Sequence, residues 1–178
     1  MINVGFKRLT DTAILPTKAH ATDSGFDLYA DKRTIITPEA TEIVSTGIAV
    51  VLPPGYEATI RPRSGITAKT SLRVQLGTID NSYRGELGVI TDNKMPLWYE
   101  EDGDIAVENS FLTVRNEEVT TLHEVFPVGS YVIEKGDKIA QLVVTPIPEA
   151  VAYEITGDLD DTDRGENGFG STGVTAAC

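Results

Sequence analysis

Short segments rich in valine, isoleucine, threonine and tyrosine recur along this chain, and glycine or proline residues stand between them. Each segment is three to eight residues long, which is the usual length of a β-strand and too short for most helices. Closely spaced strands with few helical patterns between them are typical of an all-β sandwich or barrel. The predicted strands are 34–36, 42–44, 47–52, 57–62, 75–79, 87–91, 130–133 and 139–146.

The composition narrows the range of functions. The chain has 178 residues, 40% of them hydrophobic, which suits one domain with an insertion. Its formal net charge of −12 disfavours nucleic acid as a direct partner, because that role needs a field of lysine and arginine. No apolar stretch is long enough to span a bilayer, and the chain opens without the apolar core of a signal peptide. We therefore expect a cytoplasmic protein. Cys178 is the single cysteine and cannot form an internal disulfide; its role stays open.

Residues 66–72 are predicted to form one short helix, because Ser64 and Gly65 immediately before them signal a helix start. Residues 158–173 are acidic and then glycine-rich, without a strand pattern, which predicts a mobile tail.

The segment 92–126 is strongly acidic. It holds nine acidic and two basic residues, so it carries −7 of the total charge of −12. It also contains Trp98 beside Leu97 and Tyr99. A helix-like apolar stripe is formed by Val119, Leu122, Val125 and Phe126.

Two stretches near the N-terminal half carry groups suited to anions or cations. Arg61, Arg63 and Ser64 gather at the start of the predicted helix, where exposed amides favour an anion, although solvated arginines beside an ordinary helix start are the simpler interpretation. Asp23 and Asp27 lie four residues apart with glycine and hydroxyl groups between them. Such a loop could hold Mg²⁺ through water molecules, although an ordinary turn is the simpler interpretation.

Two further stretches suggest nucleotide chemistry. Asp80 and Tyr83 lie between two predicted strands, where they could form a small cavity with a carboxylate as general base and an aromatic ring on one side. The alternative is an Asx-turn in which the tyrosine only packs. The segment 168–173 spells GxGxxG, but only five residues follow it, so a dinucleotide-binding fold is excluded. A flexible glycine-rich tail is the simpler interpretation, but Arg164 and the hydroxyl groups of this segment, with amides freed by glycine, are also what a polyphosphate needs.

Five stretches occur in a fixed order, and together they bracket nearly the whole chain. They are ATDSGFDLYA, RPRSG, GTIDNSYRGEL, GDKIAQLV and RGENGFGSTG. This series resembles the five successive motifs of the homotrimeric dUTP diphosphatase (dUTPase) family. The resemblance implies a jelly-roll-like all-β subunit, a homotrimer with shared active sites, and Mg²⁺-dependent hydrolysis of dUTP to dUMP and pyrophosphate.

The resemblance also implies roles for individual residues. Asp80 would be the general base that activates the attacking water, and Tyr83 would stack under the deoxyribose and exclude a 2′-hydroxyl. The backbone at Gly77 and Ile79 would read the uracil edge. Asp27 would support the metal, through water. The remaining substrate-binding positions are Arg63, Ser64, Gly65 and Gln141 on the phosphates, and Arg164, Phe169, Gly170, Ser171 and Thr172 on the closing C-terminal arm.

The expected organisation is a β-domain of residues 1–92 and 128–157, an acidic insert at 93–127 and a C-terminal arm at 158–178. The insert resembles those of phage-encoded dUTPases, which would place the protein in the host cytoplasm. Its charge and aromatic residues suggest a second role in binding a basic, repressor-like protein, or else a solvated loop. The insert is expected to be separate from hydrolysis. A dCTP deaminase of the same fold is the alternative enzyme.

Overall fold

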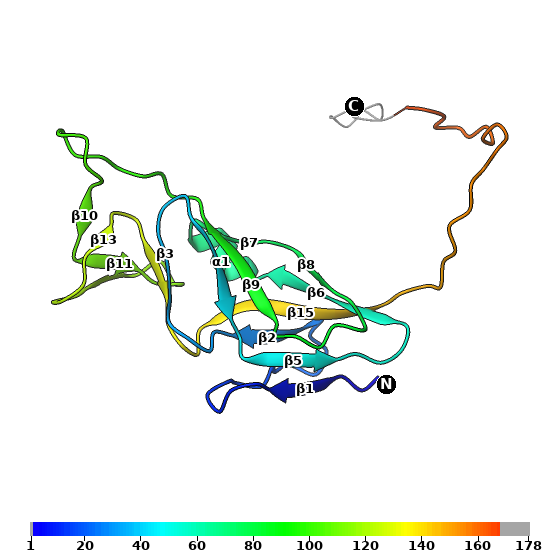
Figure 1. The fold of residues 1–178 in the computed structure, drawn as a ribbon, viewed down its shortest axis with the longest axis horizontal. Coiled ribbons are helices and arrows are strands. Elements are labelled where there is room, and N and C mark those ends of the chain that lie inside the picture. The colour runs from blue at the N-terminus through cyan, green and yellow to red at the C-terminus, as the bar shows by residue number, and fades with distance from the viewer. Residues whose placement is uncertain (1, 168–178) are drawn as a thin grey trace, which may run out of the picture. The chain divides into compact units, whose positions relative to one another are not determined.

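The computed structural model describes residues 2–167, and Figure 1 shows the chain as a ribbon. Residues Met1–Pro148 form one compact unit, and Glu149–Cys178 form a second. Within the described part of the second unit, 149–167, the backbone forms turns and bends but neither helix nor strand. No helix in the described residues has the length and apolar character needed to cross a lipid bilayer.

The first unit is almost entirely β-structure. Its described elements are β1 (Gly5–Arg8), β2 (Gly25–Tyr29), β3 (Thr34–Ile36), β4 (Thr41–Ser45), β5 (Ile48–Val51), β6 (Tyr56–Pro62), α1 (Ser64–Lys69), β7 (Leu72–Val74), β8 (Gly77–Ile79), β9 (Gly88–Asn93), β10 (Val107–Glu108), β11 (Ser110–Leu112), β12 (Glu118–Thr120), β13 (Phe126–Pro127), β14 (Tyr131–Ile133) and β15 (Lys138–Pro146).

The longest strand, β15, lies between β2 and β6 in a four-stranded sheet of order β2-β15-β6-β8. Its register places Gln141 opposite Asp27 on one side and opposite Arg61 on the other. Sheets of order β4-β9-β7 and β12-β11-β14-β3 complete the main layers, and β1 pairs with β5. The register of β15 therefore brings stretches from three of the five motifs side by side.

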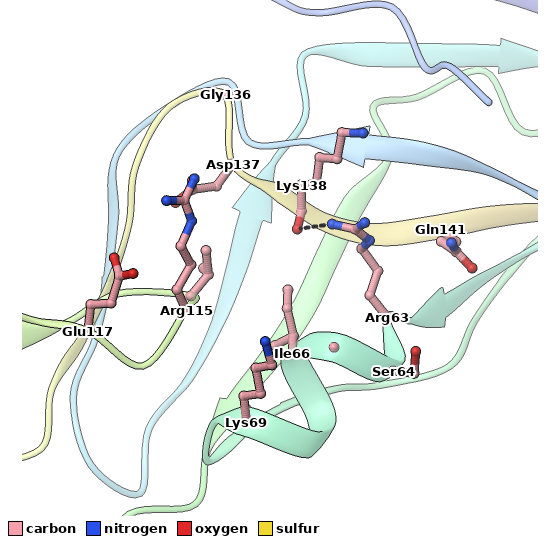
Figure 2. Close-up of a pocket in the computed structure, with 12 residues that line it drawn as sticks. Arg63, Ser64, Ile66, Lys69, Arg115, Glu117, Gly136, Asp137, Lys138 and Gln141 are labelled. Carbon is pink, nitrogen blue, oxygen red and sulfur yellow. Dashed lines mark hydrogen bonds between the residues drawn. The ribbon is translucent and has the colours of Figure 1, made fainter. Parts of the chain in front are cut away.

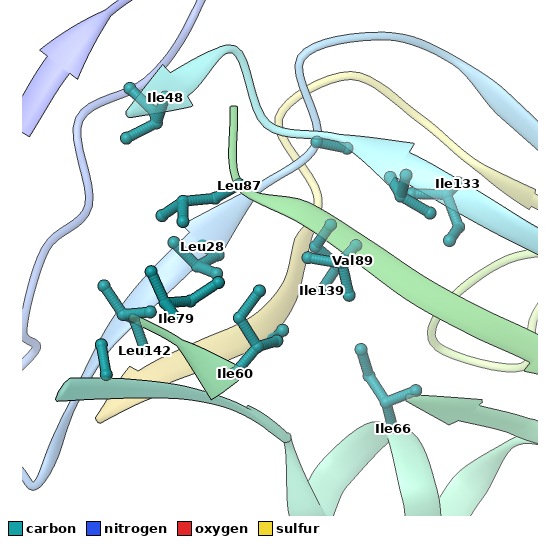
Figure 3. Packing of buried hydrophobic residues seen from close by; sticks show 14 of the residues in the cluster. Leu28, Ile48, Ile60, Ile66, Ile79, Leu87, Val89, Ile133, Ile139 and Leu142 are labelled. Atoms are coloured by element: carbon teal, nitrogen blue, oxygen red, sulfur yellow. The ribbon is translucent and has the colours of Figure 1, made fainter. Parts of the chain in front are cut away.

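Apolar side chains from these strands form one continuous core, part of which is shown in Figure 3. Leu28, Leu87, Val89 and Leu142 have no exposed surface. Burial of each such side chain contributes roughly 1.5–3 kcal/mol, so the core fixes the sheets against one another. The predicted jelly-roll-like, all-β fold class is confirmed.

Each of the eight predicted strand ranges overlaps an observed strand, and the range 34–36 coincides with β3. The predicted helix at 66–72 is wrong in its bounds. Helix α1 begins at Ser64 and ends at Lys69, because Thr70 adopts an extended backbone and its hydroxyl bonds the carbonyl of Ile66 at 2.7 Å. Leu72, predicted to be helical, instead begins β7.

The predicted helical stripe between 92 and 126 is also wrong. Val119 lies in β12 and Phe126 in β13, while Leu122 between them is 90% exposed. The period of the apolar residues fits a helix, but the backbone pairs β11 with β12 as a hairpin and aligns β11 parallel to β14. Phe126 packs edge-on against Phe111 at 5.5 Å, which gives this segment a small core of its own.

Candidate active site

A basic cavity of about 640 Å³ opens between α1 and the start of β15 (Figure 2). The predicted phosphate-binding residues Arg63, Ser64, Gly65 and Gln141 all line it. Arg63 precedes α1, and its guanidinium donates a hydrogen bond to the carbonyl of Lys138 at 3.2 Å. The junction of β6 with α1 and the pairing of β15 with β6 therefore bring the second and fourth motifs together.

Asp27 is 5% exposed and pairs with two residues that line this cavity. Its Oδ2 is 2.9 Å from Nζ of Lys138, and its Oδ1 is 3.4 Å from Nε of Arg63. The hydrogen bond to Asp27 raises the pKa of Lys138 above its usual value, which keeps that side chain charged. Asp27 thus orients two cations that line the cavity, a role that the sequence pattern alone did not suggest.

Four more charged side chains line the basic cavity. Lys69 comes from the last turn of α1, and Arg115 and Glu117 come from the β11–β12 hairpin. Asp137 lines it as well, and partial burial raises the pKa of its carboxyl. Sequence reasoning missed all of these residues. Lys138 and Asp137 stand inside the fourth motif and could have been found there, whereas the position of Arg115 depends on how the acidic segment folds.

A second, smaller cavity of about 250 Å³ holds the predicted nucleoside-binding residues, and we call it the Asp80 cavity. Gly77, Ile79, Asp80 and Tyr83 line it together with Ile60 and Glu86, among others. Gly77 and Ile79 belong to β8, which pairs with β6 at the edge of its sheet. On its other side, the described part of β8 has no strand partner, so its backbone amides and carbonyls there are available to a ligand.

Hydrogen bonds hold the turn after β8 in place. The side-chain amide of Asn81 donates hydrogen bonds to the backbone carbonyls of Pro53 at 2.7 Å and Tyr56 at 3.0 Å. The Tyr83 hydroxyl donates to the carbonyl of Glu86 at 2.9 Å, which lays its ring across Gly85. A Cβ at Gly85 would overlap that ring, so this glycine is required for the observed position of Tyr83.

The basic cavity and the Asp80 cavity share no lining residue. The structure thus groups the predicted site residues into a phosphate set and a nucleoside set. Arg164 belongs to the second unit, where its Nε donates to the carbonyl of Asn167 at 2.9 Å. The remaining predicted arm residues, Phe169, Gly170, Ser171 and Thr172, lie outside the described residues, as does Cys178.

The carboxylates at the basic cavity fit a magnesium ion that is coordinated mainly by substrate phosphates and water. In residues 2–167 no group of three or more histidine, cysteine or carboxylate side chains could hold a metal by itself. Mg²⁺ in phosphate-processing sites usually retains several waters and takes one or two carboxylates together with substrate phosphates. Asp27, which contacts Arg63 and Lys138 of the cavity lining, is the carboxylate that the sequence pattern predicts for such a role.

The dUTPase family profile matches residues 11–96 and 128–173 of this chain. Curated deoxyuridine 5′-triphosphate nucleotidohydrolases are similar over almost the full length. The protein from Clostridioides difficile is 38% identical, with 97% of this chain and 99% of the relative covered, and that from Gloeothece citriformis is 39% identical, with 95% of each covered.

Solved structures of phage enzymes are also similar. The dUTPase of Staphylococcus bacteriophage 80alpha in complex with dUpNHpp is 32% identical with a TM-score of 0.86, over 97% of this chain and 99% of that one. The dUTPase of the S. aureus phage phi11, whose structure displays a species-specific insert, is 28% identical with a TM-score of 0.80. The match covers 88% of this chain and 97% of that one. Another phi11 structure describes the coordination of a structural Mg(II) ion in that protein. Sequence and fold agree over both halves of the chain, and the protein is an enzyme of the dUTPase family.

Proposed function

We propose that this enzyme hydrolyses dUTP to dUMP and pyrophosphate, with Mg²⁺ as cofactor and Asp80 as general base. The observation that carries the proposal is the division of the site into two cavities. One presents cations and small residues suited to phosphates, and the other presents a carboxylate, an aromatic ring and a free strand edge suited to a nucleoside. Mg²⁺, when bound, would neutralise and orient the triphosphate.

In this mechanism the Asp80 carboxylate accepts a proton from a water molecule as the water oxygen attacks the α-phosphorus. The bond between the α-phosphorus and the oxygen bridging to the β-phosphate breaks, and pyrophosphate leaves. Arg63, Ser64, Gly65 and Gln141 hold the phosphates so that this bond lies in line with the attacking water.

Selectivity for deoxyuridine would come from the Asp80 cavity. The free edge of β8 at Gly77 and Ile79 offers fixed donors and acceptors, so a cytosine would leave at least one of them unpaired. The ring of Tyr83, held by its hydrogen bond to Glu86, would pack against the sugar where a 2′-hydroxyl would need space.

The separation of the two cavities supports a homotrimer with shared sites. A nucleotide must contact phosphate and nucleoside residues at once, and here they line different cavities of one chain. In a symmetric oligomer the Asp80 cavity of one subunit can face the basic cavity of the next. Arg164, Phe169, Gly170, Ser171 and Thr172 would then close the site over the γ-phosphate and the uracil.

A nucleotide panel tests this function. dUTP, UTP, dTTP and dCTP are each incubated with and without Mg²⁺, and released pyrophosphate and ammonia are measured. We expect pyrophosphate from dUTP with Mg²⁺ and little product from the others. Ammonia from dCTP would instead identify the deaminase of the same fold, and absence of pyrophosphate from dUTP would overturn the proposal.

A second function for the insert is favoured by its surface. Trp98 is 56% exposed, Tyr99 62% and Val107 55%. Acidic residues surround them in the sequence at 100–104 and 108. Aromatic anchors rimmed by one sign of charge are typical of a protein-binding surface, here for a basic partner such as a DNA-binding repressor. Comparing capture of a candidate repressor by the native chain and by a Trp98→Ala, Tyr99→Ala variant tests this role; equal capture would count against it.

A further inference from the structure

The turn of the β11–β12 hairpin reaches the basic cavity. Val114, Arg115 and Glu117 line this cavity beside Arg63 and Gln141, as Figure 2 shows for the four polar residues. The hairpin lies between the two stretches, 11–96 and 128–173, that the dUTPase profile matches. A segment outside the stretches that the family profile matches therefore contributes side chains to the phosphate side of the site.

The structure holds this turn in place. The backbone amide of Thr113 donates a hydrogen bond to the carbonyl of Glu117 at 2.9 Å. The backbone amide of Asn116, whose φ is 63°, donates one to the carbonyl of Thr113 at 2.8 Å. The Asn116 side chain accepts a hydrogen bond from the hydroxyl of Tyr131 at 2.8 Å. Tyr131 is 1% exposed and also accepts from the amide of Ser71 at 3.1 Å. A core tyrosine thus ties the hairpin turn to the segment that follows α1.

The charge of Arg115 partly offsets the raised pKa of Asp137, but no hydrogen bond or ion pair in the described part of the chain engages its guanidinium. None of the ion pairs or side-chain hydrogen bonds among residues 2–167 uses it. By contrast, Arg63 and Lys138 are both paired with Asp27. The cavity walls carry four cations against two carboxylates, in a protein whose formal net charge is −12. Such a local reversal of charge favours an anionic ligand.

We propose that Arg115 binds the polyphosphate of the substrate, so that the insert completes the phosphate side of the active site. The inference rests on the proposed function, which places the triphosphate in the basic cavity. A guanidinium presents a planar fork of donors that can bind two phosphate oxygens at once. Figure 2 shows Arg115 on the side of the cavity away from Arg63 and Ser64, so in this arrangement it would meet phosphate oxygens that those two residues leave exposed. This conflicts with the expectation that the insert is separate from hydrolysis.

Three variants of the full-length enzyme test the proposal. Arg115→Gln removes the charge, Arg115→Lys keeps the charge without the fork, and Glu117→Gln removes a neighbouring negative charge from the same turn. For each, KM and kcat for dUTP are measured, together with equilibrium affinities for dUMP, inorganic pyrophosphate and a non-hydrolysable dUTP analogue, all with Mg²⁺.

Arg115→Gln should lower the affinity for the dUTP analogue and for pyrophosphate by about tenfold, as expected for the loss of one charged hydrogen-bonding group. The affinity for dUMP should stay within about twofold of the native value. Arg115→Lys should recover part of the lost affinity, and Glu117→Gln should raise the affinity for pyrophosphate. Unchanged analogue affinity in Arg115→Gln, or an equal loss for dUMP, would overturn the inference. A native enzyme that releases no pyrophosphate from dUTP would instead overturn the proposed function.

Discussion

The ammonium group of Lys138, which lines the basic cavity, lies 2.9 Å from the carboxylate of Asp27. The two residues come from neighbouring strands, β15 and β2, and Arg63 approaches the other carboxylate oxygen at 3.4 Å. A buried carboxylate with two cations of the cavity wall is therefore a positioning group. It fixes the positions of two of the cations that line the cavity.

Replacing Asp27 with asparagine should misplace both cations. The amide cannot balance Lys138, so the pKa of that lysine should fall towards its ordinary value, and KM for dUTP should rise about tenfold. Steady-state kinetics and a Mg²⁺ titration measure the effect. Asp23→Asn is the matched control, because Asp23 accepts a local hydrogen bond from the amide of His20. An Asp27→Asn enzyme that binds dUTP normally would show that the ion pairs do not position the phosphate-binding groups.

Replacing Asp80 with asparagine should abolish turnover and leave binding intact. The amide keeps the shape of the side chain but cannot accept the proton from water, so kcat should fall by a factor of about 10² to 10⁴. Stopped-flow or steady-state hydrolysis gives kcat, and calorimetry gives the affinity for a non-hydrolysable dUTP analogue. Asp11→Asn, at an exposed turn away from both cavities, serves as the control. Near-normal turnover in Asp80→Asn would remove Asp80 from the mechanism.

The ring of Tyr83 should set the preference for deoxyribose. Tyr83→Ala removes the ring from the Asp80 cavity, so the ratio of kcat/KM for dUTP to that for UTP should fall by about tenfold or more. Tyr83→Phe keeps the ring and loses the hydrogen bond to the carbonyl of Glu86, so most of the selectivity should remain. Parallel assays with dUTP and UTP measure both ratios. If Tyr83→Ala keeps the native ratio, another wall must reject the 2′-hydroxyl.

The strands were predictable from sequence where their own residues carry the signal. The run 34–36 is β-branched throughout and forms β3, and the turn glycines mark the strand ends. The acidic segment was not predictable in this way. Its apolar residues Val119, Leu122 and Phe126 have a helical period, yet pairing of β11 with β12 and β14 decides the structure. Tertiary pairing overrides local periodicity there.

The same contrast holds for the site. Asp80 and Tyr83 could be chosen from sequence because their chemistry and their motif agree, and both line one cavity. Arg115 could not be chosen, because its place at the basic cavity depends on the fold of the hairpin and on the bond between Tyr131 and Asn116. The motif resemblance implied active sites shared between subunits, but it did not indicate which residues of one chain would line which cavity.

Acid should destabilise the fold through two buried carboxylates, Asp31 and Asp92. The hydrogen bond from Thr12 lowers the pKa of Asp31, and that from Lys94 lowers the pKa of Asp92. A lowered folded-state pKa adds stability above the unfolded value of about 3.9, and that stability is lost as pH falls through the folded-state value. Thermal melting from pH 7 to pH 3 should show Tm falling most steeply below about pH 4. An Asp31→Asn variant should lose less Tm over this range than the native enzyme; an equal or larger loss would contradict the assignment.

Two inactive variants should restore activity when they assemble together. Asp80→Asn damages the nucleoside side and Arg63→Ala damages the phosphate side, and the two residues line different cavities of one chain. If each active site takes Asp80 from one subunit and Arg63 from the next, a randomly mixed trimer contains some sites with neither defect. Equal mixing after unfolding and refolding should then recover about a quarter of native activity, whereas sites built within one chain would recover none. Size-exclusion chromatography with light scattering confirms that the mixture is trimeric. Because each variant alone supplies the background rate, activity no greater than the mean of the two separate preparations would show that the site is not shared between subunits.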